Sequence, residues 1–187
     1  MSNFISLRNI HLYPLTEDSK EKLEYGNPIA IPGAVKVEIT PEVAENNYYA
    51  DGILYEAIKK FAKASITMQT AAINLKTQAE MCGHEYDEGK NKVVCNEADT
   101  PPYFGRKYER VKANGESRYI ALNKVVFGQI ADNGQTAGES VEWQDSGDIV
   151  GTAMATINNG NWKDMMDTSE GNAEDIKKFF ESFLPAE

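Results

Sequence analysis

Apolar and polar residues alternate with a period of two along parts of this chain, and this pattern restricts the fold more than any other feature of the sequence. In residues 35–40, two valines and an isoleucine alternate with polar residues. A longer run covers residues 61–73, where small and aliphatic residues share one parity. Its polar parity comprises Lys63, Ser65, Thr67 and Gln69. Because successive side chains of a strand point to opposite faces, both stretches predict strands with one buried face.

Further segments are rich in the β-branched and aromatic residues that favour strands. They are residues 5–13, 28–31, 48–50 with 53–57, 90–95, 103–111, 119–127, 141–144 and 149–157. Asn, Asp and Gly residues that suit tight turns separate many of them. Residues 119–127 alternate less cleanly, which indicates a strand covered on both faces. We therefore expect a mainly β fold, an antiparallel sandwich or barrel.

Two helices are predicted beside the strands. An apolar stripe at helical spacing favours a C-terminal amphipathic helix over about residues 173–184. The stripe consists of Ile176, Phe179, Phe180, Phe183 and Leu184. A short flanking helix is expected over residues 75–82, ended by Gly83.

The length of 187 residues fits one domain, and no repeat or linker divides it. We expect a single domain over residues 1–187 with an N-terminal arm over about residues 1–24 and extended hairpin or loop arms. Residues 16–25 form a charged, uncovered-looking stretch, and residues 130–141 form a polar loop.

The net charge of −10, from 19 basic and 29 acidic residues, argues against a protein that grips nucleic acid phosphates or an anionic membrane. No apolar run reaches the length of a membrane-spanning helix, and the first residues lack the layout of a secretion signal. With only Cys82 and Cys95 in the chain, free thiols are the simpler interpretation and a disulfide is an alternative.

The sequence contains few of the residue patterns that are typical of catalytic or metal-binding sites. Only His11 and His84 are available as bases, and Cys82, His84 and Cys95 do not have the spacing of a zinc site. We expect no enzyme activity, no catalytic or metal residues and no cofactor. A basic cluster with interleaved aromatic residues is a candidate for nucleic acid binding. It contains Arg106, Lys107, Arg110 and Lys112 with Tyr103, Phe104 and Tyr108.

Several motifs, in this order, resemble the major tail proteins of bacteriophages with long flexible tails. These motifs are Leu7-Arg8-Asn9-Ile10-His11, the segment YGNPIAIPGAVKVEI at residues 25–39, NYYADG at residues 47–52 and KFFESF at residues 178–183. The similarity spans nearly the whole chain. Residues 53–64 depart from the family pattern, because they carry alanines and lysines where an acidic, glycine-rich start is common.

The resemblance implies a structural virion protein made in the bacterial host cytoplasm and located in the tail. Such subunits form hexameric rings that stack into a tube. The tube surrounds a tape measure protein during assembly and conducts DNA during ejection without binding it specifically. Extended hairpins of six subunits close a barrel around the lumen. The expected partners are further copies of the chain, the tape measure protein, the tail terminator and distal tail proteins, with no membrane.

On this interpretation Ser65, Thr67 and Gln69 are candidates for the lumen-facing strand. The loop residues Asp132, Asn133, Gln135 and Glu139 are candidates for contacts between rings. Two alternatives stay open. One is a ring of an effector-secretion tube. The other is a β-sandwich carbohydrate-binding module, whose sugar platform would use Tyr103, Tyr108, Trp143 and Trp162.

Overall fold

A computed structural model of the chain describes residues 2–132, 134, 136, 147–168, 173–181 and 183. Their strands and helices follow one another as β1 (Phe4–Asp18), β2 (Leu23–Tyr25), β3 (Ile29–Ile31), β4 (Ala34–Ala50), β5 (Ile53–Thr70), α1 (Leu75–Cys82), β6 (Glu85–Asp87), β7 (Lys92–Val94), β8 (Tyr103–Lys112), β9 (Ser117–Phe127), β10 (Ile149–Met154), β11 (Lys163–Asp167) and α2 (Ala173–Glu181). The fold is mainly β with antiparallel pairing, as the alternation predicts.

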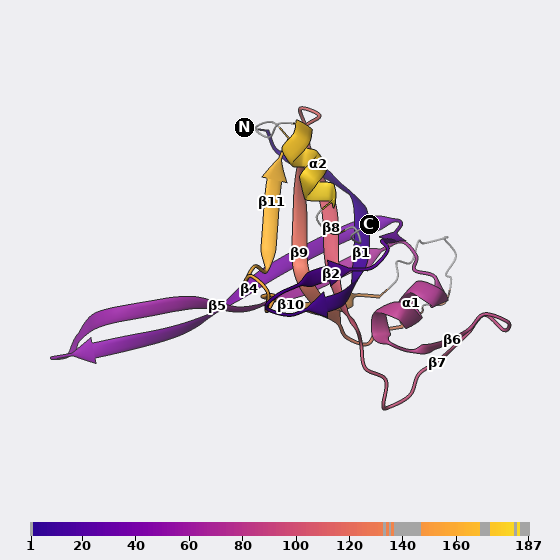
Figure 1. Cartoon of the computed structure of the whole chain (residues 1–187), viewed down its shortest axis with the longest axis horizontal. Coiled ribbons are helices and arrows are strands. Elements are labelled where there is room, and N and C mark those ends of the chain that lie inside the picture. Colours follow the sequence, from indigo (N-terminus) through magenta and orange to yellow (C-terminus); the bar gives the residue numbers. More distant parts are fainter. Residues whose placement is uncertain are drawn as a thin grey trace.

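Most of the described strands belong to one sheet in the order β2-β1-β8-β9-β10-β5-β4, with β3 added to β1 and β11 added to β9. Strand β9 pairs with β8 along one edge. Its other edge is divided, because residues 118–122 pair with β11 and residues 124–127 pair with β10. The β10-β5-β4 part therefore diverges from β11 and passes behind β8 and β9 (Figure 1).

The β1-β8-β9 part of the sheet is covered on both faces. On one face the main core packs against β5 and β10. It includes Ile10, Leu12, Ile66, Met68, Phe104, Leu122, Val125 and Phe127. On the other face a smaller core of Tyr13, Tyr25, Ala121 and Phe183 lies beneath α2. The expectation that residues 119–127 are covered on both faces is confirmed, since most of β9 is buried.

Both expected helices and an extended hairpin are present. Helix α1 is capped at its start by Asn74, whose side-chain oxygen accepts a hydrogen bond from the Thr77 amide at 2.8 Å, and at its end by Gly83 with φ 72°. Helix α2 places Ile176 and Phe179 half-buried against the sheet. The side chains of Phe180 and Leu184, also expected in its apolar stripe, lie outside the described residues.

The N-terminal segment differs from the arm expected for residues 1–24. Strand β1 lies inside the sheet between β8 on one edge and β2 and β3 on the other. Ile10 and Leu12 are fully buried in the main core. The charged stretch over residues 16–25 also contacts the rest of the subunit. The Asp18 carboxylate accepts a 2.7 Å hydrogen bond from Lys124 Nζ and another from the Ile157 amide. Burial of the apolar residues of β1 thus places this strand inside the sheet, despite the charged residues around them.

Arg106 on β8 is fully buried, and its three guanidinium nitrogens have no hydrogen-bond partner among the described residues. It lies over the Tyr108 ring, 5.1 Å from the centroid, and burial lowers its pKa to about 10. A buried charge without hydrogen bonds is costly, so we expect Arg106→Met to raise the free energy of unfolding by about 1–4 kcal/mol. Urea denaturation measures this change. Arg106→Lys, which keeps the charge, is the control. A large decrease in the free energy of unfolding of the Arg106→Met variant would contradict the prediction.

Candidate functional site

The most unusual feature of the molecule is the β4-β5 hairpin, whose outer half projects away from the rest of the protein (Figure 1). Its strands pair from Ala34 opposite Thr70 to Ala50 opposite Ile53. They are joined by Asp51 and Gly52, which both have positive φ, 52° and 77°. An Asp-Gly pair between two apolar strands is a strong sequence signal for a two-residue hairpin turn. The sequence prediction placed strands on both sides of this pair but did not join them into one hairpin.

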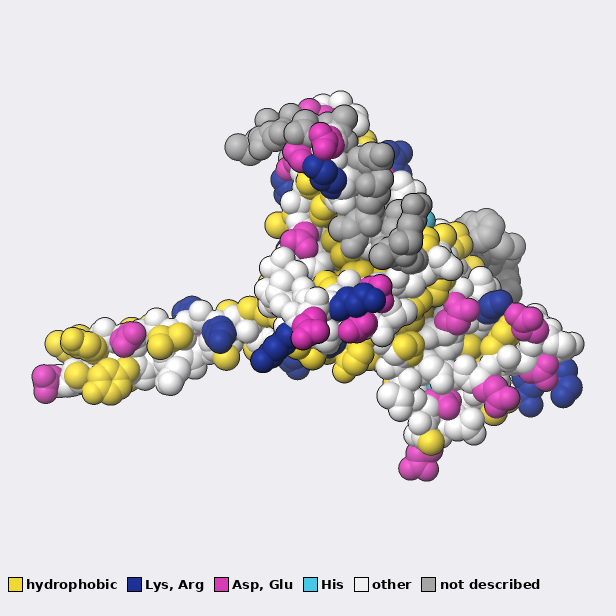
Figure 2. All heavy atoms as spheres, in the orientation of Figure 1, with side chains coloured by type: hydrophobic (Ala, Val, Ile, Leu, Met, Phe, Trp, Pro, Cys, Tyr) yellow, Lys and Arg dark blue, Asp and Glu magenta, His cyan; other side chains and the backbone are white. Residues whose placement is uncertain are grey.

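The outer half of the hairpin exposes many large apolar side chains. Exposed fractions reach 61% at Tyr49, 70% at Ile53 and 76% at Tyr55. Val43, Tyr48, Leu54 and Ile58 are also exposed. Figure 2 shows hydrophobic side chains along this projection up to its end. Contiguous exposed apolar residues of this kind mark surfaces that contact another molecule.

Both edges of the projecting half are open. In the part of the chain that the structure describes, β4 pairs with no strand other than β5, and β5 pairs with β10 only through residues 64–68. An isolated two-stranded ribbon is marginally stable in water, and an open edge can accept a further strand. Exposed ion pairs between Glu45 and Lys59 at 3.1 Å and between Glu42 and Lys63 at 3.6 Å connect the two strands and add little to the stability of the ribbon. The hairpin is therefore suited to pairing with another chain.

The predicted lumen-facing residues Ser65, Thr67 and Gln69 lie together on the inner half of β5. They face away from the main core, because Ala64, Ile66, Met68 and Thr70 of the alternate parity are buried. Ser65 Oγ donates to Glu42 Oε1 at 2.8 Å, and Gln69 Nε2 donates to Asp148 Oδ1 at 2.6 Å. Their cross-strand neighbours, which the sequence analysis did not select, extend this mostly polar face. The neighbours are Lys36, Glu38, Thr40, Val150 and Thr152.

Of the predicted inter-ring loop residues, Asp132 is exposed and belongs to no helix or strand. Asn133, Gln135 and Glu139 lie outside the described residues, as does the predicted strand 141–144. The sequence predictions for these positions stay predictions.

A groove of about 480 Å³ lies beside the inner end of β4. Its apolar lining includes Val37, Tyr108 and Ile120, and β1 and β11 complete its walls. Four cations also line it, namely Lys36, Arg110, Arg118 and Lys163. Among the described residues that line this basic groove there is no aspartate or glutamate. Two of these cations are ion-paired, Lys36 with Glu38 at 2.9 Å and Arg118 with Asp167, so the positive charge of the groove comes mainly from Arg110 and Lys163.

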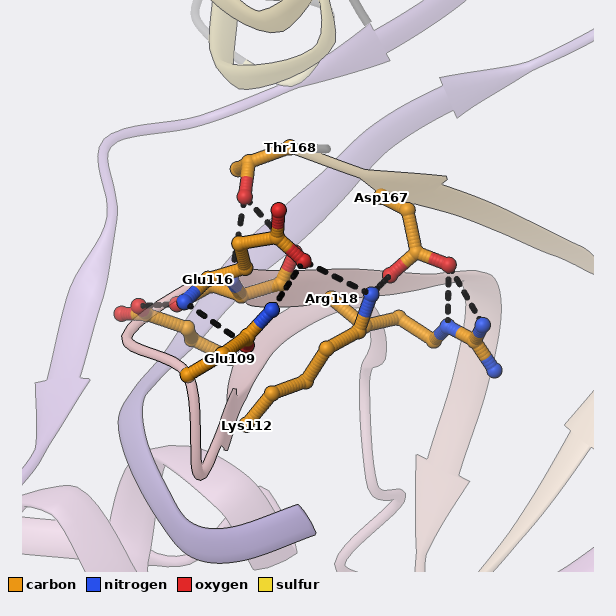
Figure 3. Close-up of polar contacts among 8 residues, drawn as sticks. Glu109, Lys112, Glu116, Arg118, Asp167 and Thr168 are labelled. Atoms are coloured by element: carbon orange, nitrogen blue, oxygen red, sulfur yellow. Dashed lines mark hydrogen bonds and ion pairs between the residues drawn. The ribbon is translucent and has the colours of Figure 1, made fainter. Parts of the chain in front are cut away.

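A network of ion pairs at the β8-β9 turn fixes one side of the basic groove (Figure 3). Arg118 donates to Asp167 Oδ2 through Nε and Nη2, and Lys112 Nζ lies 2.9 Å from Asp167 Oδ1. Nearby, the buried Glu109 carboxylate accepts hydrogen bonds from Arg8 at 2.8 and 2.9 Å and from Ser117 Oγ. The hydrogen bonds from Arg8 lower the pKa of Glu109. Residues from β1, β8, β9 and β11 are thereby held in one arrangement.

Hydrogen bonds from Arg118 and Lys112 lower the pKa of Asp167 to about 2, from the ordinary value of 3.8. A carboxylate with a depressed folded-state pKa stabilises the fold above its unfolded pKa, and this stability is lost as the pH falls through the folded value. We expect Asp167→Asn to be less stable than the unmodified chain at pH 5. The difference should shrink between pH 4 and pH 2. Urea denaturation at each pH measures it, and a difference that is the same at every pH would contradict the assignment.

The alternatives raised by the sequence find little support. In the basic aromatic cluster, Arg106, Lys107, Phe104, Tyr108 and Lys112 are buried, so they do not form an exposed surface for stacking bases. A sugar platform needs several exposed rings side by side. Tyr108 is buried and Trp162 stacks on Phe61 at 4.3 Å between centroids, which leaves Tyr103 as the exposed ring among the described candidates. Trp143 lies outside the described residues.

The candidate metal ligands are used in other ways. His84 Nδ1 lies 2.6 Å from Asp99 Oδ2, and His84 Nε2 lies 2.8 Å from Gln129 Oε1. Cys82 is buried and Cys95 is exposed, and both are free thiols. The disulfide that was the alternative interpretation is therefore not formed. His11 contacts its neighbour Asn9 through the backbone oxygen at 3.2 Å. No group of three potential ligands is arranged to hold a metal ion within the described parts of the chain.

Neither described helix has the length and apolar composition that crossing a membrane requires. Searches with protein-family models and among curated proteins find no match to this sequence.

Proposed function

We propose that this protein is the tube subunit of a long flexible phage tail. In this role six copies form a ring, and rings stack into a tube around the tape measure protein. The tail terminator and distal tail proteins bind the two ends of the tube, and DNA passes through it during ejection. The protein acts as a structural component and not as an enzyme.

The observation that carries this proposal is the projecting β4-β5 hairpin with its two open edges and exposed apolar residues. Such a ribbon does not stabilise a monomer, because residues 44–60 are outside both cores. Pairing of hairpins from neighbouring copies would satisfy the open edges and cover the apolar side chains. Head-to-tail contacts between identical subunits close into rings when the rotation permits.

The charge of the chain is consistent with a conduit for DNA. A hexamer of chains with a net charge of −10 each carries 6 × −10, or −60. Acidic groups repel phosphates, so a wall with few free cations would let DNA slide without binding. The mostly polar face around Ser65, Thr67 and Gln69 has the character of a wetted wall.

Negative-stain electron microscopy of the purified full chain over a range of concentrations tests the proposal. We expect rings or short tubes at high concentration, and six-fold symmetry in class averages viewed down the axis. Sedimentation velocity on the same samples gives the fraction assembled. Monomers at every concentration, also in the presence of the tape measure protein, would contradict the proposed function. Rings that bind a soluble effector and never stack into a long tube would favour the secretion-tube alternative.

A further inference from the structure

The basic groove contains two cations, Arg110 and Lys163, with which a negatively charged occupant can pair. Arg110 on β8 and Arg118 on β9 are directly opposite each other in the strand register. Like charges at such positions destabilise a sheet. Arg118 is neutralised by Asp167. Arg110 and Lys163 form no ion pair among the described residues, although Arg110 lies over the Phe4 ring at 3.9 Å.

The groove also reaches the open edge of the sheet. Val37 on β4 packs against the main core, whereas Lys36 is paired with Gln69 on the outer surface. Both line the groove, so it extends across the edge of β4 from one face to the other. A strand entering here can form main-chain hydrogen bonds with β4 while its side chains contact the apolar floor. The groove is thus suited to an extended, acidic and apolar segment.

One exposed segment of this chain has that chemistry. The hairpin tip, defined as residues 47–56, contains three tyrosines, Ile53 and Leu54 together with Asp51 and Glu56. It contains no lysine or arginine, and its side chains are exposed apart from the half-buried Ala50. Tyrosine rings also attract guanidinium and ammonium groups at close range. The tip and the basic groove are complementary in both charge and polarity.

We infer that the basic groove of one copy binds the hairpin tip of a neighbouring copy. This inference rests on the proposed function, because it names the surface that receives the hairpin within the assembly. The carboxylates of Asp51 and Glu56 contact the cations at the rim, and the aromatic and aliphatic side chains cover the floor. Occupation by the tip also supplies a carboxylate to Arg110, which forms no ion pair among the described residues.

Charge reversal on each side tests the contact. Glu56→Lys changes the tip without altering the turn, and Arg110→Glu places a carboxylate opposite Arg118, which the sheet tolerates. We expect each single variant to lower the assembled fraction about tenfold at a fixed concentration, because it puts like charges together at the interface. The double variant should restore assembly to within about threefold of the unmodified chain. Lys20→Glu, an exposed change of the same charge, is the control and should assemble normally.

A photo-cross-linking amino acid in place of Tyr55 gives direct evidence. In mixtures of isotopically labelled and unlabelled chains, we expect cross-links between copies to map to residues 35–39, 108–118 or 163–165. If the unmodified chain assembles but the cross-links map elsewhere, or the double variant is not rescued, the groove assignment is wrong and the tube proposal stands. If the unmodified chain does not assemble, the proposed function fails. If duplex DNA binds the unmodified chain but not the Arg110→Glu variant, the groove is a nucleic acid site and the inference is overturned.

Discussion

Replacing residues 44–60 by Asn-Gly should abolish assembly while leaving the subunit folded. The change joins Val43 to Phe61, which are directly opposite in the hairpin, through a two-residue turn of the favoured type. It keeps the stacking of Phe61 on Trp162 and removes only residues that are exposed apart from the half-buried Ala50. The shortened chain loses the projecting part of both open edges and six of the seven large apolar side chains that are exposed on the outer half of the hairpin. We expect no rings in micrographs and a monomer in sedimentation velocity.

Thermal unfolding checks that this variant is folded. Its free energy of unfolding should differ from that of the unmodified chain by no more than about 0.5 kcal/mol, as for substitutions at other exposed positions. The matched control shortens the second projecting hairpin, β6-β7, by replacing residues 88–91 with Asn-Gly. That control removes exposed residues of a different hairpin and should still assemble. Rings formed by the chain that lacks residues 44–60 would show that the projecting hairpin is not the assembly surface.

Phe183→Ala should destabilise the subunit by about 3–5 kcal/mol, the usual cost of removing a buried phenylalanine. Phe183 is 4% exposed and stacks on Tyr25 at 4.3 Å between centroids. It lies so close to Gly105 that a Cβ at this position would be 2.6 Å from the ring. Its ring also lies 4.3 Å from Lys107 Nζ. The residue therefore links the end of the C-terminal segment to β1, β2 and β8.

Differential scanning calorimetry measures this loss, which corresponds to about 2–4 °C in Tm for each kcal/mol in a domain of this size. Burial lowers the pKa of Lys107 to about 8, so water entering the cavity should move this pKa upward in the variant. Tyr49→Ala, a truncation of a 61% exposed ring on the hairpin, is the control and should leave Tm nearly unchanged. A loss below about 1 kcal/mol for Phe183→Ala would indicate that this residue is not docked in solution.

The expected strand on each side of Asp51 and Gly52 exists, yet the joined hairpin and its projection were not predicted. Alternation shows which residues of a strand face a core, but not whether a core is present at that point along the strand. Ala62 has the same parity as Ala64 and Ile66 and is nevertheless exposed, because the strand register shifts between Glu42 and Val43 and leaves Ala62 without a partner in β4, so that Phe61 packs against the main core instead.

The basic groove was also absent from the sequence prediction. Its cations come from β4, β8, β9 and β11, and nothing in their spacing along the chain relates them. For the buried lysine and arginine residues of β8, the sequence predicted a surface that the structure does not have. Their interleaving with aromatic residues suggested an exposed surface, whereas α2 and the curled sheet cover them.

The sequence by itself determined the antiparallel β class, the positions of most strands, both helices and the end of α1 at Gly83, because these depend on local periodicity, caps and turns. Only the tertiary structure decided which strands are central, which edges stay open and which charges meet in a groove. Those properties depend on contacts between residues far apart in the chain, where the burial of β1 outweighed its charged surroundings and the hairpin extended beyond any core that its own subunit supplies.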